Sequence, residues 1–372
     1  MIRTSLREEL AGKFVKERGE SFYRRWVRKQ GLEVISAHYV EDLNTVELKP
    51  WSKVGGRGIF INHELSDFSN DCQVLEIPPA GSTNPQRHLY EEMIYVLKGR
   101  GSTAVWNHKG KKMSFEWGEG SIFAIPLNTW YQHFNASGSN PVRLVAVTNA
   151  PLVLNLFEDE EFVFNTKYDF ESRFAGEEDY FEPKEEVTGF FLETNFIHDA
   201  RTLRLVSAKE RGGEGAHIRF KLARGTMSAH ISEFPVGVYK KAHRHGPGAH
   251  VIILSGEGYS LMWPEGEKMR RYNWRPGTLI VPPDRWWHQH FNVGREPARY
   301  LAFKYEGTIY SRTEEGIPKS WISRREGGDQ IDYADEDPMV RRMFEEELAK
   351  RGIRSRMDPI YEEELRRLSA KG

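Results

Sequence analysis

Residues 243–292 read HRHGPGAHVIILSGEGYSLMWPEGEKMRRYNWRPGTLIVPPDRWWHQHFN, and residues 86–135 read QRHLYEEMIYVLKGRGSTAVWNHKGKKMSFEWGEGSIFAIPLNTWYQHFN. The two stretches align without a gap at an offset of 157 residues, and 15 of the 50 aligned positions are identical. Average composition alone would give only about three identities. The shared positions include glycines and prolines, which fix turns and hence the path of the chain. The sequence therefore predicts two copies of one domain.

Both copies have the pattern of short β-strands. Apolar runs at residues 93–97, 121–125, 251–254 and 278–281 alternate with clusters of Gly, Pro, Asn and Asp. Many short strands separated by turn residues are typical of a β-sandwich or a β-barrel. We therefore expect an all-β protein.

Three histidines of the second copy have the spacing of a metal site. Residues two apart on a strand point to the same face, so His243 and His245 can reach one ion together. His288 follows a turn and lies on a later predicted strand, which can bring a third imidazole beside them. Three neutral nitrogen ligands leave coordination positions open for a substrate and for oxygen or water.

The spacing of these residues resembles the two signature motifs of the cupin superfamily. The matching positions are Gly237, His243, His245, Gly256, Gly277, Pro283, His288 and Asn292. Arg285 replaces the inner glycine of the second motif. The resemblance covers both halves, about residues 50–315, and implies a bicupin. Its expected fold is two double-stranded β-helix (jelly-roll) barrels with helical terminal extensions, and its expected metal lies in the second barrel.

One cupin ligand is missing from the second copy. The family's glutamate follows the second histidine by three or four residues, and these positions hold Ala249 and His250. The internal repeat pairs Ala249 with Glu92 of the first copy, which favours a site of three histidines. His250 then points to the other face of its strand. With the longer spacing of the family, His250 is instead a fourth ligand.

The run His-Arg-His-x-x-x-Ala is similar to the gentisate and salicylate ring-cleaving dioxygenases. Those proteins are bicupins that bind Fe(II) through three histidines. The resemblance implies Fe(II), O₂ and an anionic aromatic substrate, while Mn, Ni or Zn stay open as alternatives. It departs from the family because the site lies in the second barrel, and because Val251 stands near the position of a family arginine.

Other residues of the second copy are candidates for chemistry or substrate binding. His290, two residues beyond His288, is a candidate general acid or base, although the equivalent His133 favours a role in packing nearly as well. Arg244 and Arg285 are candidates to pair with a substrate carboxylate. The aromatic candidates for stacking on a substrate ring are Trp286, Trp274 and Tyr259.

The metal ligands of the first copy are incomplete. Gln86 stands in place of the first histidine and Tyr131 in place of the last, while His88 and Glu92 are retained. We therefore expect a vestigial site made of Gln86, His88, Glu92 and His133, in a barrel that serves mainly as a structural partner.

The composition narrows the class of protein. The chain has 372 residues, enough for two domains, and a net charge of −1, without the basic excess of a nucleic-acid binder. No apolar run reaches the roughly 20 residues that span a membrane, and the amino terminus lacks the apolar core of a signal peptide. The single Cys72 excludes an intrachain disulfide or a metal site built from cysteines. We expect a cytoplasmic protein without nucleic-acid or membrane partners.

The chain is expected to have five parts. A helical extension covers residues 1–45, a first barrel residues 46–175, an acidic linker residues 176–200, a second barrel residues 201–315 and a helical extension residues 316–372. Apolar stripes on the terminal helices predict packing within the chain or between copies in a homo-oligomer.

Three functions are compatible with the sequence. The preferred one is an Fe(II) dioxygenase that cleaves a hydroxylated aromatic acid in aromatic compound catabolism. The second is a redox-neutral cupin enzyme, a decarboxylase, isomerase or hydrolase that uses Mn, Ni or Zn. The third is a non-catalytic binding or activator protein. Three convergent histidines argue against the third function, because a scaffold does not need them.

Overall fold

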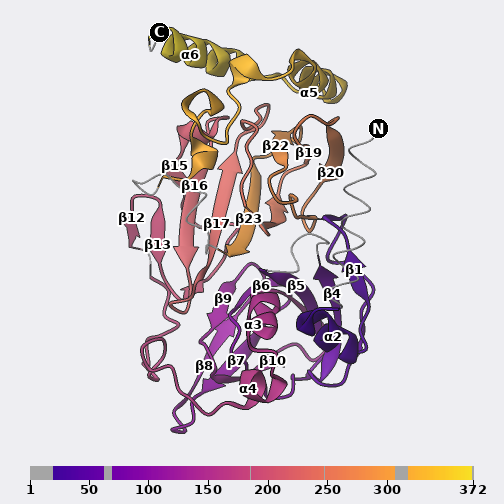
Figure 1. The fold of residues 1–372 in the computed structure, drawn as a ribbon, viewed down its shortest axis with the longest axis vertical. Helices are drawn as coiled ribbons and strands as arrows, with labels where there is room; N and C mark the ends of the chain where they lie inside the picture. Colours follow the sequence, from indigo (N-terminus) through magenta and orange to yellow (C-terminus); the bar gives the residue numbers. More distant parts are fainter. Residues whose placement is uncertain (1–19, 63–68, 185, 247, 306–316, 371–372) are drawn as a thin grey trace.

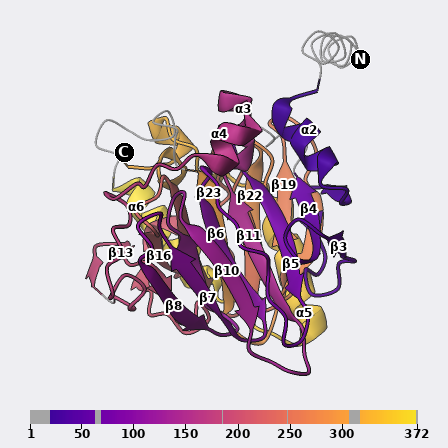
Figure 2. The same cartoon turned by 90° about the horizontal axis from the view of Figure 1, so that it is seen from below.

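The computed structural model describes residues 20–62, 69–184, 186–246, 248–305 and 317–370 (Figure 1). The first half of the chain forms one β-barrel and the second half forms another, stacked on it. The helix predicted near the amino terminus is α2 (Phe22–Lys29), and the part expected at residues 1–19 lies outside the described residues. Figure 2 looks along the stack, with the strands of the first barrel in front of those of the second.

The first barrel contains one large sheet and one small sheet. The large sheet has the order β1-β4-β5-β11-β6-β9-β14, with β3 beside β4, and the small sheet has the order β10-β7-β8. The strands are β1 (Val34–Ser36), β3 (Lys49–Trp51), β4 (Gly56–Asn62), β5 (Asp71–Ile77), β6 (Glu92–Lys98), β7 (Gly101–Trp106), β8 (Lys112–Trp117), β9 (Ile122–Ile125), β10 (Trp130–Asn135), β11 (Val142–Thr148) and β14 (Phe196–Ile197).

The second barrel repeats this arrangement. Its large sheet has the order β12-β13-β16-β17-β23-β18-β21-β2, with β15 beside β16, and its small sheet has the order β20-β19-β22. The strands are β2 (Tyr39–Val40), β12 (Val187–Thr188), β13 (Phe191–Glu193), β15 (Val206–Ser207), β16 (Ala216–Lys221), β17 (Met227–Phe234), β18 (His250–Ser255), β19 (Gly258–Trp263), β20 (Arg270–Trp274), β21 (Leu279–Ile280), β22 (Trp287–Asn292) and β23 (Ala298–Tyr305). The prediction of an all-β protein with two jelly-roll barrels is confirmed.

The two barrels exchange short strands. β2 comes from the first half of the chain but pairs with β21 of the second barrel, and β14 comes from the second half but pairs with β9 of the first barrel. β2 and β14 lie 157 residues apart, so the internal repeat begins well before residue 86. Each barrel is therefore completed by the other half of the chain.

Equivalent polar contacts hold the two exchanged segments. The Ser121 hydroxyl donates to the carbonyl of His198 at 2.7 Å, and the Thr278 hydroxyl donates to the carbonyl of Glu41 at 2.7 Å. The guanidinium of Arg143 donates to the Leu43 carbonyl in one segment (3.1 Å), and that of Arg299 to the Ala200 carbonyl in the other (3.0 Å). Because these donors are largely buried, each segment is fixed at its carbonyls.

The large sheets pack against each other, and their strands are buried on both faces. On β5, Val74 belongs to the hydrophobic core between the barrels, while Leu75 belongs to the interior of the first barrel. On β23, Leu301 faces the same shared core and Tyr300 the interior of the second barrel. A strand covered on both faces often has a continuous apolar run rather than an alternating one, as residues 93–97 of β6 and 251–254 of β18 do.

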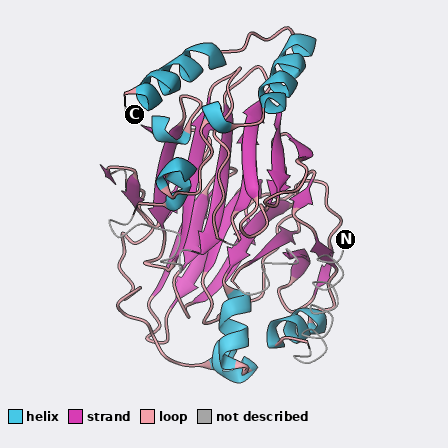
Figure 3. Ribbon diagram, turned by 45° about the horizontal axis from the view of Figure 1, so that its top comes forward, coloured by secondary structure: helices cyan, strands magenta, loops and turns pink. Residues whose placement is uncertain are grey.

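Helices lie at the two ends of the molecule (Figure 3). They are α2, α3 (Ala150–Phe157) and α4 (Glu160–Asn165) at the first barrel, and α5 (Pro338–Arg351) and α6 (Met357–Ser369) at the second. Short 3₁₀ turns are η1 (Lys209–Arg211), η3 (Lys319–Trp321), η4 (Arg324–Glu326) and η5 (Tyr333–Asp335). The buried Phe344 of α5 packs on Phe291 of β22, so α5 covers the outer face of the small sheet.

The structure divides residues 176–200 differently from the expected linker. Tyr180 and Phe181, in the middle of the acidic run, are buried in the core of the first barrel. The later part of the segment contains β12, β13 and β14. Its acidic side chains Glu178, Asp179 and Glu182 are exposed, which is why the composition resembles that of a solvated connection.

Among the described residues, none of the helices combines the length and the hydrophobicity that crossing a membrane requires.

The exchanged segment near Glu41 offers a test of this arrangement. Thr278→Val keeps the shape of the side chain but removes the hydroxyl, so the buried bond to the Glu41 carbonyl is lost. We expect the free energy of unfolding to fall by about 1–3 kcal/mol, measured by urea denaturation. Thr278→Ser keeps the hydroxyl, so its free energy of unfolding should fall by less than that of Thr278→Val. Equal losses in the two variants would contradict a role for this bond.

Candidate metal centre

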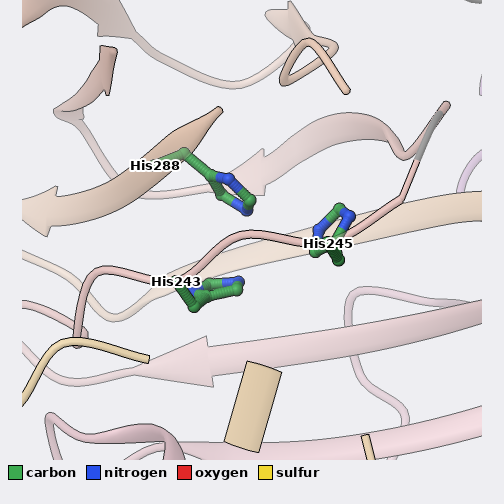
Figure 4. A group of neighbouring side chains, drawn as sticks. All are labelled: His243, His245 and His288. Atoms are coloured by element: carbon green, nitrogen blue, oxygen red, sulfur yellow. The ribbon is translucent and has the colours of Figure 1, made fainter. Parts of the chain in front are cut away.

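His243, His245 and His288 converge in the second barrel (Figure 4). Their candidate ligand nitrogens all lie within 4.8 Å of one another. His243 and His288 form a backbone bridge, with His243 N–H donating to the His288 carbonyl (3.0 Å) and His288 N–H to the His243 carbonyl (2.9 Å). Nitrogens bound to one ion at about 2.1 Å lie roughly 3–3.5 Å apart, so small ring rotations would complete the site. The predicted grouping of these three residues is present.

The protonation of the three rings suits a metal. Each Nδ1 faces a backbone carbonyl: Lys241 for His243 (3.2 Å), Gly246 for His245 (2.9 Å) and Trp286 for His288 (3.2 Å). A carbonyl oxygen only accepts hydrogen bonds, so each Nδ1 carries the proton and each Nε2 keeps its lone pair. This hydrogen bond is the usual device that orients a histidine ligand. The donor set therefore fits a divalent cation bound at the three Nε2 atoms.

Burial keeps these imidazoles neutral. It lowers the pKa of His245 to about 4, and burial together with His288 and Arg211 lowers the pKa of His243 well below its usual value. The pKa of His288 is lowered in the same way by burial and by His245. Neutral imidazole is the form that binds a metal, so no proton has to leave the ligands at neutral pH.

Ala249 stands where the first barrel has Glu92. Ala249 lines the cavity of the second barrel, and none of the described residues that line this cavity is acidic. His250 does not line it: its Nδ1 lies 3.0 Å from the Gly248 carbonyl and 3.2 Å from the side-chain amide of Asn70 in the first barrel. The side chain of His250 thus points toward the other barrel, as the alternation of a strand requires.

The wall of the cavity carries positive charge. Arg211, Arg219 and Lys304 line it together with the three histidines. The guanidinium of Arg211 lies 3.4 Å from Nε2 of His243, beside the point where the histidines converge. A guanidinium group next to a divalent ion favours an anionic ligand.

Arg244 and Arg285, candidates for substrate binding, are occupied elsewhere. Both guanidinium groups donate to the carboxylate of Asp329, at distances of 2.8 to 2.9 Å. Burial raises the pKa of Asp329, but the two arginines outweigh it and hold this pKa below its usual value. Arg244 also lies over the ring of Trp287 at 4.5 Å, as Arg87 lies over Trp130 at 4.7 Å in the first barrel. The structure therefore gives the two arginines a role in anchoring the segment around Asp329.

The aromatic candidates also lie away from the cavity. Tyr259 stacks on Phe291 on the outer face of the small sheet, with ring centroids 4.5 Å apart and the guanidinium of Arg271 above it. Trp286 is half-buried and its ring lies near His38. Trp274 belongs to the core, with its indole directed at Ser260. The sequence could not separate inward from outward positions at these aromatic residues.

His290 does line the cavity, and a chain of hydrogen bonds orients its ring. The Trp274 indole donates to the Ser260 hydroxyl (3.1 Å), and the oxygen of this hydroxyl lies 2.7 Å from Nδ1 of His290. Burial, aided by Lys240 and Arg211, lowers the pKa of His290 to about 3, so the ring is neutral.

The same chain of hydrogen bonds exists in the first barrel. Trp117 donates to the Thr103 hydroxyl (2.8 Å), and this hydroxyl lies 2.7 Å from Nδ1 of His133. Its presence in both barrels indicates that it supports the fold as well as orienting the ring, so the packing interpretation of His290 and the catalytic one are compatible.

Several residues of the cavity were missed in the sequence. Besides Arg211, Arg219 and Lys304, they include His217, His230 and Tyr300. Burial raises the pKa of Tyr300, but the nearby Lys240 and Arg211 outweigh it and leave this pKa below its usual value. The internal repeat could have indicated one of them. His230 aligns with Gln73, and Gln73 lines the cavity of the first barrel.

The first barrel keeps part of the same site. Gln86 and Tyr131 form the backbone bridge that His243 and His288 form in the second barrel. Nδ1 of His88 donates to the Tyr90 carbonyl (2.8 Å), while its Nε2 lies 3.0 Å from the Tyr131 hydroxyl and 3.3 Å from Glu92. The Tyr131 hydroxyl also donates to Glu92 at 2.9 Å. A tyrosine hydroxyl thus bonds to both retained ligands, which supports the expectation of a vestigial site.

Comparison with known proteins agrees with this architecture. Residues 73–148, which contain the strands from β6 to β11, match the cupin domain family Cupin_2. The second barrel repeats the strand order of the first. The first barrel is therefore a cupin domain, and the chain has the architecture of a bicupin.

Among curated proteins, the bicupin is similar to 5-aminosalicylate 1,2-dioxygenase of a Comamonas species, with 24% identity over 235 residues. The match covers 59% of this chain and 61% of that relative, so the chain spans about three fifths of its length. Similar solved structures include oxalate decarboxylase of Bacillus subtilis (14% identity, 74% of this chain, 78% of that one, TM-score 0.48). Another is the formate complex of Lactobacillus farciminis oxalate decarboxylase (13% identity, 74% of this chain, 87% of that one, TM-score 0.48).

The histidine cluster predicts that the protein binds about one equivalent of metal through His245 and its two partners. His245→Ala removes one nitrogen donor from the cluster and should weaken binding of a divalent metal by roughly 100-fold or more, since loss of even an outer partner costs 10–100-fold. Metal analysis after dialysis should fall from about one equivalent toward zero. His198→Ala, which changes an exposed histidine, should keep the full equivalent. A full equivalent in His245→Ala would contradict the site.

In the first cupin, a single substitution is expected to raise the metal content rather than lower it. Tyr131→His replaces the hydroxyl that joins His88 and Glu92 with a third donor, so the metal content should rise from one toward two equivalents. Tyr131→Phe removes the same hydroxyl without adding a donor and should stay at one. A folded Tyr131→His variant that still binds only one equivalent of metal would show that further metal ligands are missing from the first barrel.

Proposed function

We propose that the second cupin is the catalytic barrel of an Fe(II)-dependent dioxygenase, and that its substrate is a hydroxylated aromatic acid of the gentisate or salicylate type. The observation that carries the proposal is the donor set. Three neutral histidines converge in a cavity whose described lining has no carboxylate and has three cationic side chains.

The charge balance supports an anionic substrate. Three neutral ligands leave a divalent ion with its full charge, and such an ion favours bidentate oxygen ligands such as a hydroxy-carboxylate or a phenolate. Arg211 lies beside the convergence point and can pair with a substrate carboxylate. The similar dioxygenase from Comamonas is named for 5-aminosalicylate, a hydroxylated aromatic acid, which supports the same substrate class.

Ring cleavage is balanced without a further reductant. One carbon–carbon bond of the ring breaks, both atoms of O₂ enter the product, and the ring supplies all four electrons. When bound, Fe(II) supplies a Lewis-acidic centre with open positions for the oxygen atoms of the substrate and for O₂. Within the chain, Arg211 orients the acid, and the neutral His290 offers a ring nitrogen for a hydrogen bond in the cavity.

Substrate entry requires a side chain to move. The cavity of the second cupin has a volume of about 40 Å³, whereas a benzene ring needs roughly 150 Å³. Pro318, Ser320 and Trp321 form one of its walls, and the guanidinium of Arg211 lies 5.6 Å from the ring of Trp321. Displacement of Trp321 would both enlarge the cavity and release Arg211 for the substrate.

Oxygen uptake tests this proposal. The protein purified without O₂ and loaded with Fe(II) should consume one O₂ per molecule of salicylate or gentisate, with loss of the aromatic absorbance, and should not consume O₂ with benzoate, which lacks the hydroxyl group. Arg211→Gln should lower kcat/KM by roughly tenfold or more, because a hydrogen bond to a charged group contributes about 1.5–3 kcal/mol.

Two outcomes would contradict the proposal of a dioxygenase. No O₂ uptake with any of these acids, together with turnover of a carboxylic acid by the Mn(II)-loaded protein, would favour a redox-neutral cupin enzyme. Metal binding without any turnover would favour a binding protein.

A further inference from the structure

The first cupin contains a cavity of its own. Its volume is about 180 Å³, larger than the roughly 150 Å³ of a cavity that holds benzene. Aromatic side chains make up much of its wall: Trp26, Trp51, Tyr90, Trp130 and Phe164. One six-membered ring with small substituents therefore fits.

One end of this cavity carries an ammonium group. Lys53 is exposed at the edge of the cavity, and its Nζ lies 4.1 Å from the ring centre of Phe164 and 5.4 Å from that of Trp26. Within the described part of the chain, no oxygen accepts a hydrogen bond from Nζ of Lys53. Glu160 acts on this ammonium group electrostatically, but no described carboxylate forms a salt bridge with it. A cation held over aromatic faces in this way suits the anionic end of a ligand.

The interior of the cavity carries an acceptor. His88, Glu92 and Tyr131 line it and are almost fully buried. The Tyr131 hydroxyl donates to Oε2 of Glu92, and Nε2 of His88 lies 3.3 Å from the same oxygen, while Oε1 makes no hydrogen bond with the described residues. Because Glu92 lines the cavity, a ligand there that carries an O–H or N–H group can donate a hydrogen bond to this carboxylate.

We propose that the first cupin binds a monocyclic aromatic acid without a metal. Its carboxylate pairs with Lys53 at the mouth, its ring lies between the aromatic walls, and a hydroxyl or amino group remote from the carboxylate donates to Glu92. The site is separate from the three histidines, and the inference does not depend on the proposed reaction. It gives the barrel with incomplete metal ligands a binding role of its own.

The test measures binding of 4-hydroxybenzoate to the full chain after removal of metal with a chelator, by isothermal titration calorimetry. The wild-type protein should bind one equivalent, and benzoate, which lacks the remote hydroxyl, should bind several-fold more weakly. Lys53→Gln, which changes an exposed side chain, should weaken binding by roughly tenfold. Glu92→Gln should remove the preference for 4-hydroxybenzoate over benzoate.

Arg211→Gln is the matched control in the second cupin and should leave this affinity unchanged. Loss of binding in Arg211→Gln with full binding in Lys53→Gln would place the acid in the second barrel and overturn the proposal. Absence of binding by the wild-type protein at millimolar 4-hydroxybenzoate would overturn it as well. If Glu92→Gln does not fold, the result for Lys53→Gln still decides.

Discussion

The candidate metal centre depends on three hydrogen bonds from imidazole to the main chain. The carbonyls of Lys241, Gly246 and Trp286 each hold an Nδ1 proton, which turns the lone pairs of His243, His245 and His288 toward one another. The Trp286 carbonyl lies in the turn that begins at Pro283, which recurs as Pro126 in the first half of the sequence. The barrel therefore orients the ligands before any ion arrives, and burial keeps them neutral and ready to bind it.

The same scaffold carries two different chemistries. In the second barrel, Ala249 replaces the carboxylate and the cavity is cationic. In the first barrel, Glu92 is retained, but the Tyr131 hydroxyl bonds to it and to His88. A few substitutions on equivalent strands thus separate a site suited to a divalent cation from a roomier cavity suited to an organic acid. The exchanged strands β2 and β14 join both barrels into one folded unit, so neither half of the chain completes its barrel alone.

The sequence predicted the repeat, the barrels and the three histidines because glycines, prolines and strand alternation act locally. It could not assign residues whose neighbours come from distant segments. Arg244 and Arg285 resembled substrate ligands until the position of Asp329, more than 40 residues further along the chain, was known. Arg211 and Lys304 stand outside any motif, and only the closure of the barrel brings them to the cavity. For Tyr259 and Trp274, the alternation of a strand shows which face each side chain occupies only once the pairing register of that strand is known.

The central claim is that the second barrel binds its metal through three histidines and no carboxylate. A crystal of the iron-loaded protein, measured at the iron absorption edge, tests this directly. The account predicts one anomalous peak, about 2.0–2.3 Å from Nε2 of His243, His245 and His288, with no carboxylate of the chain within bonding distance. A peak that includes Glu92 or His250 as a ligand would contradict it.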